Sequence, residues 1–131
     1  MTRDVDEEYW KDYFDTHKNR RFDDLVNRFY AENAEFENPK VAAVGREQIL
    51  EFLKHSNRDV HIRLVPRAII VNPGVTATEL DCIMHPQKDL PEFLLGPVKK
   101  GDEAKMRMAA IYHMTQDLIV RARIYWGQRF E

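Results

Sequence analysis

Helical periodicity dominates the first 55 residues of this 131-residue chain, and β-rich segments fill most of the remainder. Amphipathic patterns predict helices over residues 5–18, 21–31 and 46–55. A short alternating segment, residues 34–39, ends at a proline and predicts a strand between the second and third helices. Helices that come first and strands that follow indicate an α+β fold, with the helices packed on one face of an antiparallel sheet.

Four longer strands are predicted over residues 60–71, 75–85, 104–115 and 118–127. Turn signals separate them within each pair: Asn72-Pro73-Gly74 in the first and Gln116-Asp117 in the second. Residues 86–101 carry three prolines and two glycines and predict an irregular loop, whose apolar part, 90–95, we expect to act as a lid. A curved sheet wrapped around N-terminal helices makes a cystatin-like α+β cone, and a concave apolar interior favours small-molecule binding.

Composition narrows the classes of function. The formal net charge is −2, so there is no basic excess of the kind that nucleic-acid binding requires. The single Cys82 allows no internal disulfide and suits a reducing compartment. The acidic N-terminus is unlike a secretion signal, and no run of about 18 apolar residues predicts a membrane span. We therefore expect one cytoplasmic domain over residues 1–131, without nucleic-acid or membrane partners.

The strand predicted at residues 75–85 places two acids among apolar neighbours. Alternate side chains of a strand point to opposite faces, so Glu79 and Asp81 share one face, about 7 Å apart along the strand. The residues of that face are Ala77, Glu79, Asp81, Ile83 and His85. Carboxylates on a half-apolar face are either solvated at a sheet edge or buried beside a group on which they act.

Asp81 is the acid that we expect to carry chemistry. Burial would disfavour its charged form and raise its pKa, as suits a general acid or base near neutral pH. Its expected neighbours are Ala77, Ile83, Met108 and Tyr112. The alternative is an ion pair with an arginine, such as Arg107 or Arg123. Glu79 would share a proton with Asp81, or would be an exposed strand glutamate near the rim.

Four further polar residues are candidates for the site. His17 lies on the aromatic face of the first helix and would move protons, or would interact with the dipole at the helix C-terminus. Asn38 would orient a water or a substrate oxygen, or would cap the turn before Gly45. Tyr112 would donate a hydrogen bond to an oxyanion, or would be a core tyrosine satisfied by backbone. His85 ends the Asp81 face beside the loop at 86–101.

Three local patterns give the chain a resemblance to a known family. They are R-F-D-D-L-V-N-R-F-Y-A-E-N-A-E-F-E-N-P (21–39), G-R-E-Q-I-L-E-F-L (45–53) and I-Y-H-M-T-Q-D-L-I-V-R-A-R-I-Y-W (111–126). In this order and spacing they resemble the SnoaL-like branch of the nuclear-transport-factor-two-like superfamily. The resemblance implies the α+β cone and a homodimer formed through the outer face of the sheet. It does not fix the function, because this superfamily contains enzymes and non-catalytic binders.

The catalytic residues of two related enzyme families are only partly present. The catalytic Tyr, the general-base Asp and the hydrogen-bonding Asp of ketosteroid isomerases match Phe14, Asn38 and Ala110, so that machinery is missing.

Limonene epoxide hydrolases match on two strands. Their Tyr and Asn around the attacking water match Phe36 and Asn38, and their Arg-x-Asp pair matches Glu79 and Asp81. Their third acid matches Ile124, so this set of residues is incomplete as well.

The sequence therefore predicts a small enzyme that applies general acid–base chemistry to a hydrophobic, polyketide- or terpenoid-like molecule without a cofactor or metal. Isomerisation, dehydration, cyclisation and epoxide opening all fit. The alternative is a non-catalytic domain of the same fold that binds a small ligand or associates with a protein. The expected catalytic residues are Asp81, Glu79 and His17. The expected substrate-binding residues are Phe14, Phe36, Asn38, His85, Met108, Tyr112 and Trp126.

Overall fold

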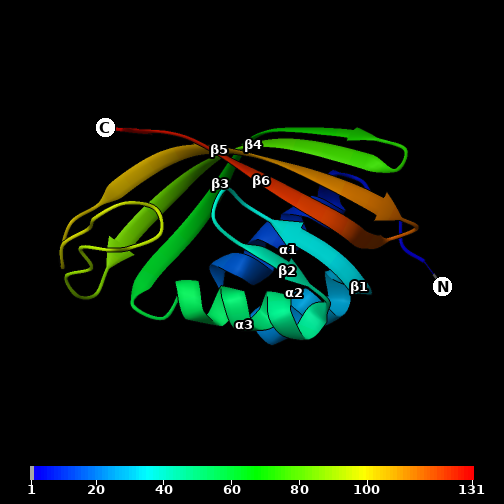
Figure 1. The fold of residues 1–131 in the computed structure, drawn as a ribbon. Helices are drawn as coiled ribbons and strands as arrows, with labels where there is room; N and C mark the ends of the chain where they lie inside the picture. The colour runs from blue at the N-terminus through cyan, green and yellow to red at the C-terminus, as the bar shows by residue number, and fades with distance from the viewer. Residues whose placement is uncertain (1) are drawn as a thin grey trace.

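A computed structural model describes residues 2–131, and it shows three helices beneath a curved six-stranded sheet (Figure 1). The strand order is β2-β1-β6-β5-β4-β3. The sheet is open and mixed, because β1 runs parallel to β6 while every other neighbouring pair is antiparallel. In chain order the elements are α1 (Glu7–Lys18), α2 (Phe22–Phe29), β1 (Tyr30–Glu37), β2 (Ala42–Val44), α3 (Arg46–Ser56), β3 (Val60–Asn72), β4 (Val75–Pro86), β5 (Ala104–Thr115) and β6 (Leu118–Phe130).

The predicted α+β cone is confirmed, but the sheet is not antiparallel throughout as predicted, because β1 pairs in parallel with β6. Further differences lie in the region of β1 and β2. The second helix ends at Phe29, and Tyr30 already belongs to the sheet, where it pairs with Ile119 of β6. Tyr30 is completely buried, so packing against the sheet overrides the helical pattern that continued through it. The three-residue strand β2 was not predicted, because an element so short has no detectable period.

Helix α1 supplies much of the aromatic core. It begins at Asp6, whose side chain caps the helix by accepting a hydrogen bond from the Tyr9 amide at 3.0 Å. Trp10 is fully buried, and its indole Nε1 donates to Thr76 Oγ1 of β4 at 3.1 Å. Because both polar atoms of this contact are satisfied, Trp10 packs on the inner face of the sheet without leaving its own indole N–H unpaired.

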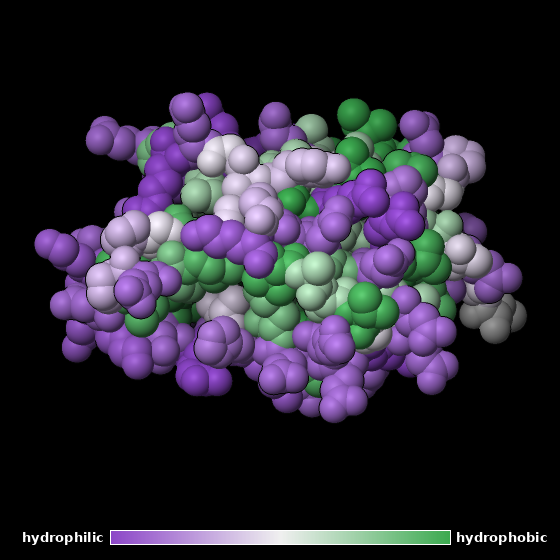
Figure 2. All heavy atoms as spheres, viewed as in Figure 1, coloured by the Kyte–Doolittle hydropathy of each residue, from purple (hydrophilic) through white to green (hydrophobic). Residues whose placement is uncertain are grey.

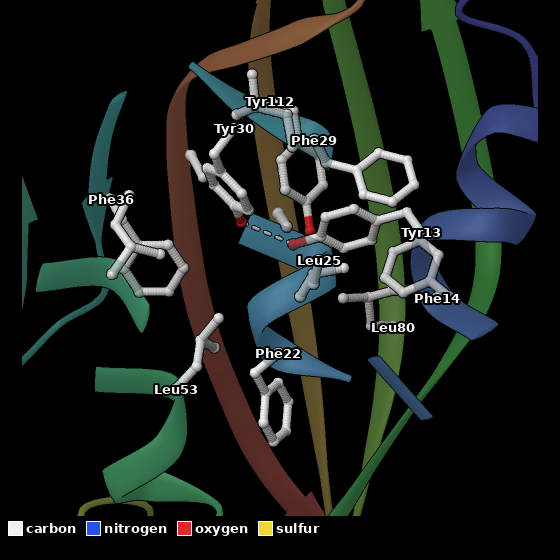
Figure 3. Packing of buried hydrophobic residues seen from close by; sticks show 14 of the residues in the cluster. Tyr13, Phe14, Phe22, Leu25, Phe29, Tyr30, Phe36, Leu53, Leu80 and Tyr112 are labelled. Carbon is white, nitrogen blue, oxygen red and sulfur yellow. Dashed lines mark hydrogen bonds between the residues drawn. The ribbon is translucent and has the colours of Figure 1, made fainter. Parts of the chain in front are cut away.

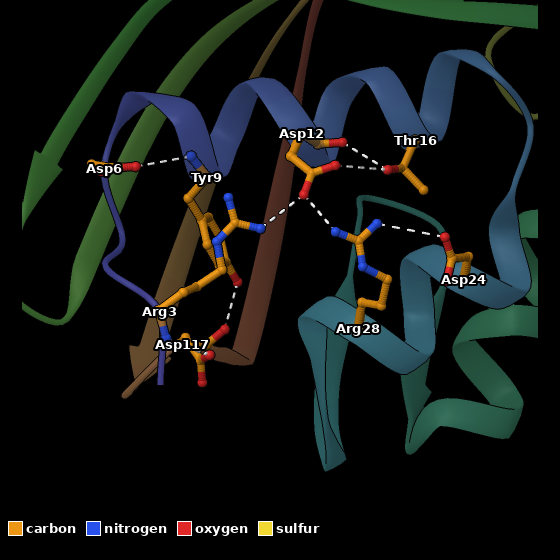
Figure 4. Close-up of polar contacts among 8 residues, drawn as sticks. All are labelled: Arg3, Asp6, Tyr9, Asp12, Thr16, Asp24, Arg28 and Asp117. Atoms are coloured by element: carbon orange, nitrogen blue, oxygen red, sulfur yellow. Dashed lines mark hydrogen bonds and ion pairs between the residues drawn. The ribbon is translucent and has the colours of Figure 1, made fainter. Parts of the chain in front are cut away.

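A polar network ties the N-terminal segment to α1, α2 and the β5–β6 turn (Figure 4). Asp12 accepts hydrogen bonds from both Arg3 and Arg28. The Tyr9 hydroxyl donates to the backbone oxygen of Asp117 at 2.7 Å, and the Arg3 amide donates to the Asp117 carboxylate at 3.0 Å. Exposed ion pairs contribute little individually, so this network orients the helices more than it stabilises them.

No helix within residues 2–131 is long and apolar enough to cross a membrane.

Substitution of Leu25 on α2 tests how much the hydrophobic core between the helices and the sheet contributes to stability. The Leu25 side chain is completely buried, whereas Ile70 of β3 is 60% exposed. We expect Leu25→Ala to lower the free energy of unfolding by about 2–5 kcal/mol, because it leaves a cavity. The control Ile70→Ala should change it by less than about 0.5 kcal/mol. Urea unfolding followed by circular dichroism measures both, and equal losses would contradict this description of the core.

Candidate functional site

The inner face of β4 is apolar, and the two predicted acids lie on the other face. The buried inner side chains are Thr76, Thr78, Leu80, Cys82 and Met84. Glu79 is exposed, whereas the Asp81 side chain is 15% exposed. The expected burial of Asp81 beside Met108 and Tyr112 is therefore wrong, and Glu79 is the exposed strand glutamate of the alternative. The physical reason is that the face with Leu80 and Cys82 buries more apolar area than the face that carries two carboxylates.

Asp81 forms an ion pair with an arginine, which was the alternative prediction. The partner is Arg67 and not Arg107 or Arg123. Arg67 Nε lies 2.6 Å from Asp81 Oδ2. The β3–β4 register shifts between Pro66 and Ala68, which leaves Arg67 as an extra residue in the strand. This bulge places the Arg67 side chain beside Asp81, and no alternation pattern in the sequence indicates it.

An interior pocket of about 90 Å³ lies between the helices and the inner face of the sheet. It brings together six of the predicted site residues: His17, Phe36, Asn38, Met108, Tyr112 and Trp126. Its other walls are mainly aliphatic, from α3, β3, β4, β6 and the loop that follows β4. Apolar walls with a few polar groups are typical of small-molecule sites.

Four predicted residues lie away from this pocket. Besides the two acids, Phe14 lines a separate groove between α1 and β3. His85 is half exposed, and its Nε2 lies 2.9 Å from Glu103. Neither residue can contact a ligand in the interior pocket, so their role in substrate binding stays a prediction.

Three buried tyrosines place their hydroxyl groups together beside the pocket (Figure 3). The Tyr13 and Tyr30 hydroxyls are 2.7 Å apart, and the Tyr112 hydroxyl points at that of Tyr13. Burial raises the pKa of all three well above its ordinary value, so they stay protonated and can donate hydrogen bonds. The Tyr112 hydroxyl faces that of another tyrosine, and Tyr112 lines the pocket together with Tyr13.

His17 is a neutral base inside the protein. It is only 5% exposed, and its Nδ1 has no hydrogen-bond partner among the described residues. Burial, and secondarily the positive charge of Arg20, lower its pKa from 6.5 to about 4. The imidazole is therefore uncharged at neutral pH, and the alternative of a cation at the helix C-terminus does not apply.

Asn38 has the structural role that the sequence left open as an alternative. Its Oδ1 accepts hydrogen bonds from the amides of Lys40 and Val41, at 2.9 and 2.8 Å, and so caps the turn before β2. The residue nevertheless lines the pocket. With Oδ1 engaged by backbone, the side-chain amide nitrogen is the atom left to interact with a ligand.

Several pocket residues were not among the predicted ones. Tyr13 sits in the aromatic stripe of α1, next to Phe14, which had been matched to a catalytic position. Asn57 follows α3 and its sequence pattern indicates only a helix end. Cys82 also lines the pocket, but burial raises its thiol pKa to about 12, so it is not a thiolate nucleophile.

Within residues 2–131, no three His, Cys, Asp or Glu side chains cluster as metal ligands would.

A surface groove lies next to the pocket and shares part of its wall. The groove has a volume of about 530 Å³ and shares Phe52, Ser56 and Leu94 with the pocket wall. Figure 2 shows apolar side chains gathered in a band between α3, at the bottom of the view, and the sheet above. Leu90 and Phe93 also line the groove, and the role of the segment at 90–95 as a lid stays a prediction.

The comparison with protein families identifies this fold. The SnoaL-like domain matches residues 10–122, which is most of the chain. The chain belongs to this family. Comparison with curated proteins gives no match.

Solved structures with the SnoaL-like cone share the fold at low sequence identity. A candidate polyketide cyclase from Xanthomonas campestris has a TM-score of 0.76 and 19% identity, covering 92% of this chain and 88% of its own. A ketosteroid isomerase-like protein from Catenulispora acidiphila, solved with trimethylamine, has a TM-score of 0.74 and 13% identity. The match covers 94% of this chain and 88% of that protein. An epoxide hydrolase of M. tuberculosis that resembles limonene epoxide hydrolase has a TM-score of 0.70 and 12% identity. The match covers 92% of this chain and 80% of that protein.

The buried His17 should make the stability of this SnoaL-like protein depend on pH. Its folded pKa of about 4 lies below the 6.5 of an exposed histidine, so between these values the unfolded chain binds a proton that the folded chain does not. The free energy of unfolding should therefore fall as the pH drops from 6.5 to 4, by roughly 3 kcal/mol from this residue. His17→Leu should remove that slope, whereas replacing the exposed His61 by Gln should keep it. Urea titrations across this pH range provide the measurement.

The outward position of Asp81 gives a second expectation. Asp81→Asn should leave ligand binding in the pocket unchanged and alter the free energy of unfolding by no more than about 1 kcal/mol, because its Arg67 partner is largely exposed. Equilibrium unfolding and ligand titration test this. Loss of binding in a folded Asp81→Asn protein would restore Asp81 to the site.

Proposed function

We propose that the interior pocket binds a small hydrophobic molecule and transforms it by general acid–base chemistry without a cofactor. One observation carries the proposal: a neutral, buried histidine and two protonated tyrosines line the same largely apolar pocket. Groups of this kind move protons and hold oxyanions most effectively where water is excluded.

The roles follow from the protonation states. His17 is in its basic form at neutral pH and accepts a proton from a carbon or oxygen of the substrate. The proton affinity of His17 rises as negative charge develops on the substrate beside it, which offsets the effect of burial. Tyr112 and Tyr13 donate to the oxygen that becomes negative, and the Asn38 amide orients the substrate. Phe36, Met108 and Trp126 form apolar walls.

A polyketide- or terpenoid-like compound is the substrate class that we propose. Isomerisation, dehydration, cyclisation or epoxide opening of such a compound needs proton transfer and oxyanion stabilisation, which these groups supply. The fold shared with a candidate polyketide cyclase and an epoxide hydrolase supports this class by analogy only. Asp81 and Glu79 have no role in this chemistry, because they lie on the outer face.

The second candidate function is ligand binding without turnover. A specific observation favours it: within residues 2–131, the pocket wall contains no carboxylate. A low pKa also makes His17 a weak base in the absence of a ligand.

Isomerisation of cyclohex-3-en-1-one tests the catalytic proposal. The reaction requires proton removal next to a carbonyl and passes through a dienolate, and the conjugated product is followed by ultraviolet absorbance. We expect the protein to accelerate it over buffer. Tyr112→Phe should lower kcat about 10²–10³-fold, the loss typical of one oxyanion donor. His17→Leu should reduce the rate to that of the buffer.

A matched pair of variants ties this reaction to the pocket. Ile124 lines the pocket, while its neighbour Tyr125 is 52% exposed on the outer face. Ile124→Phe should abolish turnover by filling the pocket, and Tyr125→Phe should have no effect. Equal rates for the protein, Tyr112→Phe and buffer would exclude this acid–base function and leave the binding alternative.

A further inference from the structure

We propose that the ligand of the interior pocket carries a neutral hydroxyl group, which binds to Asn57 Oδ1 and His17 Nδ1. This inference rests on the proposed binding function and specifies its ligand.

The side-chain oxygen of Asn57 is a buried acceptor without a partner. Asn57 is 3% exposed, and its Nδ2 donates to the Leu53 backbone oxygen at 2.8 Å and to Ser56 Oγ at 3.3 Å. These bonds fix the orientation of the amide, so Oδ1 is the atom without a partner among the described residues. An acceptor left in this state costs about 1–3 kcal/mol, which a ligand donor would recover.

His17 Nδ1 is a second buried polar atom of the same kind, and both residues line the same pocket. The ends of α1 and α3 that carry them are held together by Arg20. Its amide donates to the His17 backbone oxygen at 2.9 Å, and its guanidinium donates to the Asn57 backbone oxygen at 2.5 Å. The pocket wall therefore contains two buried polar atoms without partners, on helix ends that Arg20 connects.

The chemistry of the two atoms selects the ligand group. Asn57 Oδ1 only accepts, so the ligand must donate. His17 Nδ1 donates in one neutral tautomer and accepts in the other, and a hydroxyl satisfies either one. A carboxylate or a ketone offers no donor for Asn57. An ammonium ion would place a charge in an apolar pocket, close to the cation of Arg20 that already opposes protonation of His17.

Phenol and toluene form a probe pair that isolates the effect of the hydroxyl group. Phenol carries a hydroxyl where toluene carries a methyl on the same ring. Titration of each into ¹⁵N-labelled protein, followed by amide shifts of pocket residues, gives the two affinities. Toluene is the more apolar molecule and binds better to an unselective apolar pocket. We expect phenol to bind about tenfold more tightly instead.

Variants assign the preference to the two atoms. His17→Leu should eliminate the preference for phenol while keeping toluene binding, and its amide spectrum reports whether the fold is retained. Asn57→Ala should have the same effect. The control Ile62→Val, which changes only the volume of the apolar wall, should weaken both probes by the same factor.

The outcomes separate the two proposals. If toluene binds as well as phenol, or if the preference survives in both variants, the hydroxyl proposal is wrong and pocket binding stands. A trapped water that satisfies both atoms would give this result. If neither probe shifts pocket amides, the hydroxyl proposal and the proposed binding function fail together.

Discussion

The contact between α1 and the inner face of the sheet determines the geometry of the site. The Tyr13 hydroxyl bonds that of Tyr30 and faces that of Tyr112, inside an apolar core where a hydroxyl without a partner would be costly. This requirement limits rotation of the helix about its axis. His17 lies four residues after Tyr13 on the same helix face, so the tyrosine contact also directs His17 toward the pocket.

Sequence patterns were sufficient for the helices, the four long strands and the fold class. They were not sufficient for β2, for the parallel pairing of β1 with β6, or for the choice between the two faces of β4. The strand alternates cleanly, yet Ala77 and Ile83 made the acidic face look buried. Only the assembled sheet decides which face meets the helices. The bulge that brings Arg67 to Asp81 depends on a register shift between two strands. Such a shift leaves no periodic signal in either strand alone.

The candidate site was predicted best where local pattern and family resemblance agreed. Asn38 and Tyr112 lie in motifs of the family, and His17 extends the aromatic stripe of α1. All three reach the pocket. Tyr13 was overlooked because the position matched from the family falls on its neighbour, Phe14. Asn57 was overlooked because an asparagine after a helix is ordinary, and its unpaired oxygen becomes apparent only through its contacts.

The parallel pairing of β1 with β6 has a consequence for how the site forms during folding. These strands are more than 80 residues apart in sequence, and the pocket takes Phe36 from the first and Ile124 from the last. Closing so long a loop is slow, and it must occur before its contacts contribute stability. The helices and the β3–β4 hairpin can form from local contacts, but the binding site matures only when the two distant strands meet.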